Sequence, residues 1–332
     1  MIRIGVSGLT GMIGKNLITQ QARHREAKES LKLIAFTRRE SDTSFLQRYE
    51  IECRRVDYGN EESFSGKLED IDVFLHLAGL TKSVKPSGYY RVNVDATAAL
   101  LGALSRYGKG VKHLIFASST SASGPASSPE RPKTEEDPCT PVSHYGKSKL
   151  KAEELIRSSS LNWTIVRLPI VFGPHDYDML NMFRIAKSGV ITLFSSPQDP
   201  YSYVSAQDAG FFFLQAVQNE RLYRETYCYC YDAPLTGAQF YTMVREQLGL
   251  SPDYRYIQVP RWVAHLARAI LGLKQRMLQR ASIVNPDKIA EVATVYWVFS
   301  NSKLKNALGI ASIKENGAVA ETVRWYCEHQ LL

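Results

Sequence analysis

The sequence predicts an α/β protein organised around a doubly wound parallel sheet, with a second, smaller domain. Three observations support this prediction. A short apolar run at residues 2–6 is followed at once by three regularly spaced glycines and an amphipathic segment. Strand-like and helix-like segments then alternate through the first half of the chain, as in repeated βαβ units. The 332 residues also exceed what a single hydrophobic core usually encloses.

The first strand, at residues 2–6, leads into a glycine turn with the spacing GxxGxxG and then into a helix at residues 15–25. Such a turn lets bare backbone approach the pyrophosphate of a dinucleotide, and the helix N-terminus offers it unpaired N–H groups. A glycine turn without a ligand is the alternative, but the strand, turn and helix together favour a cofactor. The cofactor-binding residues expected in this stretch are Gly8, Thr10, Gly11, Met12, Ile13 and Gly14.

The other elements of the first half follow in alternation. Further strands are expected at residues 31–36, 51–56, 73–77, 113–117 and 163–167. Helices are expected at residues 89–107 and 145–157. Residues 123–141 are rich in Ser, Pro and Glu, which predicts a long surface loop, a common place for functional residues.

After Gly173 and Pro174 the alternation loosens. Helices are expected at residues 176–188, 205–219, 237–249, 261–273 and 314–332, and strands at residues 190–194 and 225–231. We therefore assign residues 1–173 to a Rossmann-type cofactor-binding domain, to which residues 201–231 return. Residues 174–200 and 232–313 form a smaller, mostly C-terminal α+β substrate domain, and residues 314–332 form a closing helix.

Composition narrows the class of protein. The net charge of +8 is spread along the chain without a basic run or a nucleic-acid motif, so no nucleic-acid partner is expected. We interpret the excess of positive charge mainly as an aid to solubility. It would also fit a phosphorylated cofactor or an acidic surface as a binding partner. No apolar run approaches a membrane span, and no signal-peptide core follows the N-terminus, so a cytoplasmic protein is expected.

Five scattered cysteines do not provide the neighbouring ligands that a metal site needs, so no metal is expected. They are interpreted as reduced, structural thiols. Cys228 and Cys230 alternate with tyrosines in a strand-like run, which places both thiols on one face.

The end of the second strand favours NADP over NAD, although NAD stays open. An NAD-specific fold places a carboxylate there, whereas this chain has Arg38 and Arg39. The guanidinium of Arg38 suits a 2′-phosphate through charge-assisted hydrogen bonds. Two solvated arginines at the start of a loop are the alternative. Asp57 ends the third strand and is expected near the adenine, or else as an ordinary turn residue.

Tyr145 and Lys149 are one helical turn apart and therefore share a helix face. An ammonium beside a phenol favours the phenolate, so we expect Lys149 to lower the pKa of Tyr145. Such a tyrosine can exchange a proton with a carbonyl or alcohol during hydride transfer. The serines that end the fifth strand, Ser118 and Ser119, can hold the substrate oxygen, although serines there also serve as helix caps or turns.

With these motifs the whole chain resembles the extended short-chain dehydrogenases/reductases, also called the NAD(P)-dependent epimerase/dehydratase family. The segments that carry the resemblance are the glycine turn and residues 76–79, 93–97, 116–119, 145–149, 167–174 and 204–208. The resemblance implies that Ser119, Tyr145 and Lys149 are catalytic and that Asn93 supports a water-linked proton path. It also places Leu77, Ala78, Pro169 and Val171 beside the cofactor, together with Tyr145 and Lys149. A homodimer is expected from the resemblance alone.

Departures from the family pattern bear on the substrate. Nucleotide-sugar members usually have an arginine shortly before residues 204–208, where this chain reads Pro-Tyr-Ser-Tyr. The C-terminal part is more similar to the flavonol-reductase and hydroxysteroid-dehydrogenase branches. We therefore predict an NADPH-linked carbonyl reductase or alcohol dehydrogenase on a small or less polar molecule. The alternatives are a nucleotide-sugar epimerase or dehydratase with a recycled cofactor, and a non-catalytic NADP-binding sensor.

Overall fold

The computed structural model describes residues 1–24, 30–193, 196–258, 287, 290–291 and 296–332. The helix expected at residues 261–273 lies outside the described residues. In the part of the chain that the structure describes, no helix combines the length and apolar character needed to cross a bilayer.

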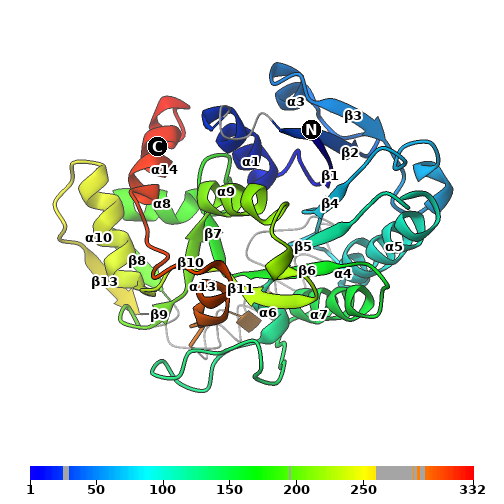
Figure 1. The fold of residues 1–332 in the computed structure, drawn as a ribbon. Helices are drawn as coiled ribbons and strands as arrows, with labels where there is room; N and C mark the ends of the chain where they lie inside the picture. The colour runs from blue at the N-terminus through cyan, green and yellow to red at the C-terminus, as the bar shows by residue number, and fades with distance from the viewer. Residues whose placement is uncertain (25–29, 194–195, 259–286, 288–289, 292–295) are drawn as a thin grey trace.

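Seven parallel strands form the central sheet, in the order β11-β6-β5-β4-β1-β2-β3 (Figure 1). These strands are β1 (Ile2–Ser7), β2 (Leu31–Thr37), β3 (Glu52–Arg55), β4 (Val73–His76), β5 (His113–Ser119), β6 (Trp163–Leu168) and β11 (Glu225–Cys228). The chain moves outward from β1 in one direction and then returns to continue in the other, as in a doubly wound sheet. The predicted fold class is confirmed.

Helices cover both faces of this sheet (Figure 1). They include α1 (Met12–Arg23), α3 (Ser44–Arg48), α4 (Pro86–Tyr90), α5 (Ala96–Tyr107), α6 (Thr120–Ser123), α7 (His144–Arg157) and α9 (Ala206–Ala216), with short 3₁₀ turns η1 (Glu61–Phe64) and η3 (Glu220–Leu222). On one face α1 and α9 pack so closely that a Cβ on Gly210 would lie 2.7 Å from the Leu17 nitrogen. On the other face lie α5 and α7.

The alternation of apolar residues along β2 explains the two layers. Leu33 and Ala35 join the buried cluster on the α1 and α9 face, whereas Ile34 and Phe36 join the cluster under α5 and α7. Successive side chains of a strand point to opposite faces, so a continuous apolar run is buried on both sides.

The second half adds smaller strand pairs and a helical group. The strands are β7 (Ile170–Phe172) with β10 (Tyr203–Ser205), β8 (Val190–Leu193) with β13 (Arg255–Gln258), and β9 (Pro200–Tyr201) with β12 (Leu235–Thr236). The helices are α8 (Leu180–Ser188), α10 (Gly237–Gln247), α13 (Ser302–Leu308) and α14 (Ala318–Glu328). Phe183 of α8 contacts Phe240 of α10 and Tyr326 of α14 through its ring, which joins the three helices into one core.

Three expectations about elements need correction. The helix expected at residues 89–107 is interrupted by a π-helical turn, η2 (Arg91–Asp95), between α4 and α5. The helix expected from residue 176 begins at Leu180, because the Asp176 carboxylate accepts hydrogen bonds from two following backbone N–H groups and forms a turn. The strand expected at residues 225–231 ends at Cys228, so Cys230 lies beyond it, although both thiols belong to one buried cluster.

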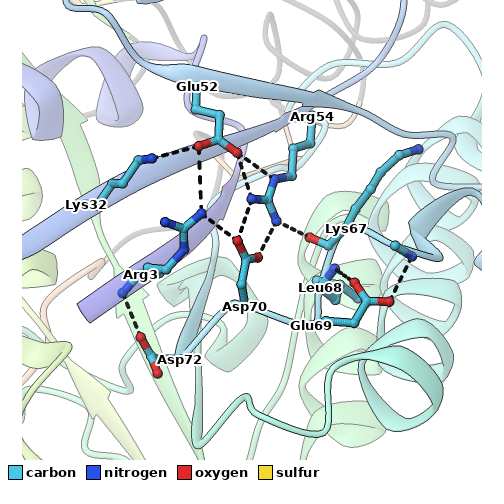
Figure 2. Close-up of polar contacts among 10 residues, drawn as sticks. Arg3, Lys32, Glu52, Arg54, Lys67, Leu68, Glu69, Asp70 and Asp72 are labelled. Carbon is cyan, nitrogen blue, oxygen red and sulfur yellow. Dashed lines mark hydrogen bonds and ion pairs between the residues drawn. The ribbon is translucent and has the colours of Figure 1, made fainter. Parts of the chain in front are cut away.

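A cluster of charged side chains covers the amino ends of β1, β2 and β3 (Figure 2). Arg54 donates hydrogen bonds to both Glu52 and Asp70, and its pKa is raised mainly by the contact with Asp70. Lys32 pairs with Glu52 at 2.8 Å, and Arg3 pairs with Asp70 at 2.5 Å. These contacts join β1, β2 and β3 to the segment that leads into β4. They lie at the amino ends of the strands, opposite the carboxyl ends.

Candidate active site

The glycine turn after β1 has the shape that a bound pyrophosphate requires. Gly8 has φ 77°, and a Cβ there would lie 2.6 Å from the backbone nitrogen of Ala78. A Cβ on Gly14 would lie 2.4 Å from the Leu9 Cα, so α1 leaves the turn through a gap that only glycine fits. Gly11 is the N-cap of α1, and no side chain among the described residues caps this helix. The residues present therefore fit a dinucleotide phosphate at the helix N-terminus.

A series of buried hydrogen bonds behind the glycine turn holds Leu77 and Ala78 in place. The Ser7 hydroxyl lies 2.6 Å from Nδ1 of His76 and accepts a hydrogen bond from the Ala78 nitrogen at 3.2 Å. Nε2 of His76 lies 3.0 Å from the Thr97 hydroxyl. Burial lowers the pKa of His76 to about 3, so the imidazole is neutral. Sequence reasoning missed the hydrogen-bonding roles of Ser7 and Thr97, although polar residues inside apolar segments are a usable signal.

The end of β2 carries the residues expected to choose the cofactor. Arg38 is exposed, and its Nε lies 3.3 Å from a Glu40 oxygen. Arg55, at the end of β3, donates a hydrogen bond to the carbonyl of Arg38 at 2.7 Å and so holds this loop. Asp57 is also exposed, and its carboxylate accepts a hydrogen bond from the Gly59 nitrogen at 2.9 Å, as a turn residue does.

Tyr145 and Lys149 lie in the first two turns of α7, and Ser119 ends β5. The helix begins here because the Ser143 hydroxyl accepts a hydrogen bond from the Gly146 nitrogen at 2.9 Å. The hydroxyl of Ser119 lies close enough to the phenol of Tyr145 to lower its pKa. The structure thus brings together three residues that the sequence separates by up to 30 positions, on one strand and one helix.

The expected effect of Lys149 on Tyr145 is wrong in this arrangement. Burial raises the pKa of Tyr145 above its usual value, and the nearby Ser119 hydroxyl opposes only part of that rise. The Lys149 ammonium donates to the carbonyl of Ala117 at 2.8 Å and lies 3.9 Å from the ring centre of Phe116. Burial lowers the pKa of Lys149 to about 7. Desolvation of both side chains therefore outweighs the attraction that sequence spacing suggests.

Asn93 lies in the π-helical turn η2 and holds the loop after β4. Its amide oxygen accepts a hydrogen bond from the Leu80 nitrogen at 2.7 Å, and its amide nitrogen donates to the Leu80 carbonyl at 3.1 Å. The same nitrogen donates to the Ser148 hydroxyl at 2.9 Å, which links the loop to α7. A π-helical turn of this kind is frequent at functional sites. The water-linked proton path through Asn93 stays a prediction.

A buried ion pair that sequence reasoning missed lies beneath α7. Arg167 of β6 donates to both carboxylate oxygens of Glu153, at 3.0 and 2.8 Å, and the Ser118 hydroxyl donates to Glu153 at 2.5 Å. Both charged residues are almost fully buried. Burial alone would raise the pKa of Glu153, but Arg167 and its other donors lower it below the usual value. Glu153 lies one turn beyond Lys149. The Glu153–Arg167 ion pair therefore fixes the helix that carries Tyr145 and Lys149.

The remaining expected residues lie at the same edge of the sheet. Leu77 and Ala78 follow β4, and Pro169 lies between β6 and β7. Val171 is in β7, which pairs with β10. The carboxyl ends of β1, β4, β5 and β6 therefore converge here, at the edge where ligands bind in open parallel sheets. Among the described residues, no group of three or more His, Cys, Asp or Glu side chains is placed to hold a metal ion.

The fold and site define a class of dinucleotide-dependent enzymes, and a comparison with family models agrees. The model of the NAD dependent epimerase/dehydratase family matches residues 4–227, so the chain belongs to this family. The match runs from β1 through β11 and includes the glycine turn, Tyr145 and Lys149. The resemblance found in the sequence is confirmed, and an enzyme of the oxidoreductase, epimerase or dehydratase type follows from it.

Among curated proteins, the chain is 23% identical to a ceramide reductase of Caulobacter vibrioides over 83% of this chain and 73% of that enzyme. It is 40% identical to UDP-glucose 4-epimerase 4 of Oryza sativa subsp. japonica, over 36% of this chain and 34% of that enzyme.

Among solved structures, a UDP-glucose 4-epimerase of Thermotoga maritima with UDP-glucose has a TM-score of 0.75 at 20% identity, covering 99% of this chain and 100% of that one. A dTDP-glucose 4,6-dehydratase of Streptomyces venezuelae with NAD bound has a TM-score of 0.76 at 18% identity, covering 99% and 98%. At these identities the likeness shows the fold.

Proposed function

We propose that the chain is an NADPH-linked carbonyl reductase, or an alcohol dehydrogenase in the reverse direction, acting on a small or less polar substrate. The observation that carries this proposal is the placement of the Tyr145 phenol, on the first turn of α7, beside the Ser119 hydroxyl at the end of β5, with Lys149 one helical turn further along α7. Two hydroxyls held on a strand and a helix can both donate a hydrogen bond to the oxygen of one carbonyl group.

In the reducing direction, the Ser119 hydroxyl donates a hydrogen bond to the carbonyl oxygen, and Tyr145 transfers its proton to that oxygen. A phenol with a raised pKa is protonated at neutral pH and is therefore ready to act as the acid. Lys149, whose pKa is lowered to about 7, is able to lose or gain a proton near neutral pH. The nicotinamide of the cofactor supplies or accepts the hydride when it is bound.

The cofactor would be held by residues at the carboxyl edge of the sheet. The glycine turn, with Thr10, Met12 and Ile13 on its partly exposed rim, would receive the pyrophosphate. Arg38 would bind the 2′-phosphate of NADP, and Asp57 lies one strand further along the same edge. Solved structures with a similar fold contain NAD, which supports a nicotinamide dinucleotide in general.

The division of the chain into two domains near residue 173 remains a prediction.

Two observations support a substrate other than a nucleotide sugar. Residues 200–203 contain no cation for a diphosphate, and the Ser202 hydroxyl there is buried and accepts a hydrogen bond from the Phe299 nitrogen at 2.9 Å. The match to the ceramide reductase extends over 83% of this chain, whereas the match to the rice epimerase extends over 36%. A nucleotide-sugar epimerase or dehydratase is the second candidate, favoured by the higher local identity to the rice enzyme.

The test combines a substrate panel with one substitution. Short- and long-chain ketones, aromatic ketones and nucleotide sugars are incubated with NADPH, and both NADPH absorbance and product identity are followed. A reductase consumes NADPH in proportion to product, whereas an epimerase converts its sugar with none consumed. We expect Tyr145→Phe to lower kcat by a factor of about 10² to 10⁴ because the acid is removed.

The control for this substitution is Tyr107→Phe, which changes a tyrosine on α5 away from the site. NADPH affinity, measured by fluorescence titration, should stay within about twofold for both variants, since neither change touches the glycine turn and Tyr145→Phe keeps the aromatic ring expected beside the cofactor. Full activity of Tyr145→Phe would refute the proposed role of the phenol. Product formation without NADPH consumption would favour the epimerase.

A further inference from the structure

The first turn of α7 is held by a carboxylate from a distant part of the chain. The Asp287 carboxylate accepts a hydrogen bond from the backbone nitrogen of His144 at 2.7 Å through one oxygen, and from that of Tyr145 at 2.9 Å through the other. The first N–H groups of a helix have no partner within the helix. Asp287 thus satisfies two of these groups, across 143 and 142 positions of sequence.

A second carboxylate completes the arrangement. The Ser143 hydroxyl, which caps α7 through the Gly146 nitrogen, donates a hydrogen bond to Glu291 at 2.7 Å. Glu291 is 5% exposed, and its backbone carbonyl accepts a hydrogen bond from the indole of Trp297 at 3.0 Å. Residues 143, 144 and 145 are therefore tied directly to residues 291 and 287, and Gly146 is tied to them through Ser143.

This turn contains the phenol on which the proposed reaction depends. A proton donor must stand within hydrogen-bond reach of the reacting oxygen, and a displacement of about 1 Å can cost roughly a hundredfold in rate. The Glu153–Arg167 pair fixes α7 only from its third turn onward. A helix end without partners frays, so the position of Tyr145 needs contacts of its own.

We propose that Asp287 and Glu291 are positioning residues for Tyr145, which hold the first turn of α7 in the place required for proton transfer. The C-terminal part of the chain thereby takes part in the catalytic centre, although it contributes no reacting group. Negative side chains at this point also interact favourably with the helix dipole. The inference rests on the proposed function, because it concerns the same phenol.

The charge of Glu291 supplies a second, independent readout. Its carboxylate contributes to the raised pKa of Tyr145, as does the neighbouring phenol of Tyr89. Among the described residues, the titratable groups that act on the phenol are Glu291 and, on α4, Tyr89, whose ring lies beside that of Tyr145; Lys149 follows one helical turn later on α7, and Asp287 binds the backbone of the same turn as Tyr145. Glu291→Gln keeps an oxygen that accepts from Ser143 but removes the charge. The pH at which activity falls as Tyr145 deprotonates should therefore move downward in this variant.

The closing experiment compares Asp287→Asn, Glu291→Gln and the matched control Glu315→Gln. Glu315 accepts a hydrogen bond from the Val319 nitrogen at the start of α14, so it tests loss of a helix-capping carboxylate elsewhere. In Asp287→Asn the amide hydrogens of His144 and Tyr145 should exchange with water about tenfold faster or more, because one acceptor becomes a donor. Its kcat should fall about tenfold with NADPH affinity unchanged.

The outcomes separate the two claims. Faster exchange confined to the first turn of α7, with a fall in kcat at constant NADPH affinity, supports the positioning role. Unchanged exchange in Asp287→Asn, or equal losses of kcat and NADPH affinity, would overturn it, as would an unmoved pH profile in Glu291→Gln. An active Tyr145→Phe variant would instead overturn the proposed function. The exchange measurement needs no substrate, so it decides the structural half of the inference in every case.

Discussion

The guanidinium of Arg38 lies exposed at the carboxyl end of β2, within 3.3 Å of Glu40. Both side chains are more than three-fifths exposed, and an ion pair of this kind contributes little to stability. Arg38 could therefore exchange Glu40 for a ligand phosphate at small cost. The loop that carries it is held by Arg55, so its backbone is already placed before any ligand arrives.

Replacing Arg38 tests the proposed preference for NADP. Arg38→Ala should weaken NADPH binding about tenfold or more, because a charge-assisted hydrogen bond to the 2′-phosphate is lost, and it should leave NADH binding almost unchanged. Fluorescence titration with both cofactors measures the ratio. Arg106→Ala, which removes an exposed arginine from α5, is the charge-matched control. Equal affinities for the two cofactors in the unmodified protein would contradict the preference.

At the scale of elements, β2 and the edge strand β3 are joined to β1 by apolar packing and by the charged cluster of Figure 2. Arg54 is the centre of this cluster, because it is the most buried cation there and contacts two carboxylates. Contacts with Arg54 and Arg3 lower the pKa of Asp70 to about 2. The ionised form of Asp70 is therefore favoured by folding.

Asp70→Asn tests this contribution. Because the folded pKa is lowered, the stabilisation is present above the unfolded pKa of about 4 and is lost as the pH falls from about 4 to about 2. Asp70 is nearly half exposed, so we expect a loss of no more than about 1 kcal/mol at neutral pH. Urea unfolding across pH measures it, with the exposed Glu154→Gln as control. An undiminished difference at pH 2 would contradict this origin.

At the scale of the whole molecule, one buried ion pair joins the helix of the candidate active site to the centre of the sheet. Glu153 on α7 contacts Arg167 on β6 and Ser118 on β5, close to the carboxyl ends of both strands. Arg157 also pairs with Glu153 from the surface side. Removing one member of a buried pair leaves an uncompensated charge, whereas removing both leaves an apolar interior.

Arg167→Met should therefore lower the free energy of unfolding by about 3–5 kcal/mol. The double variant Glu153→Met with Arg167→Met should recover most of that loss, because no buried carboxylate is left behind. Urea unfolding of the two single variants and the double variant measures the coupling. Additive losses would show that the two side chains act independently.

Much of the fold could be predicted from the sequence, because the signals are local. β2 is apolar along its length and is buried on both faces, and the glycine turn needs only neighbouring residues to form. The YxxxK spacing fixes Tyr145 and Lys149 on one face of any helix. Their ionisation could not be predicted in the same way, since it depends on how deeply Ala117, Phe116 and Ser119 bury them.

The sequence by itself determined the order of strands and helices along the chain, the glycine turn after β1 and the identity of the candidate pair. These follow from periodicities and spacings that span fewer than about 20 residues. Only the tertiary structure decided that burial raises the pKa of Tyr145 and that Glu153 meets Arg167. It also decided that Asp287 and Glu291 hold the first turn of α7. The physical reason is that desolvation and long-range hydrogen bonds depend on which segments pack together, and no local pattern records that.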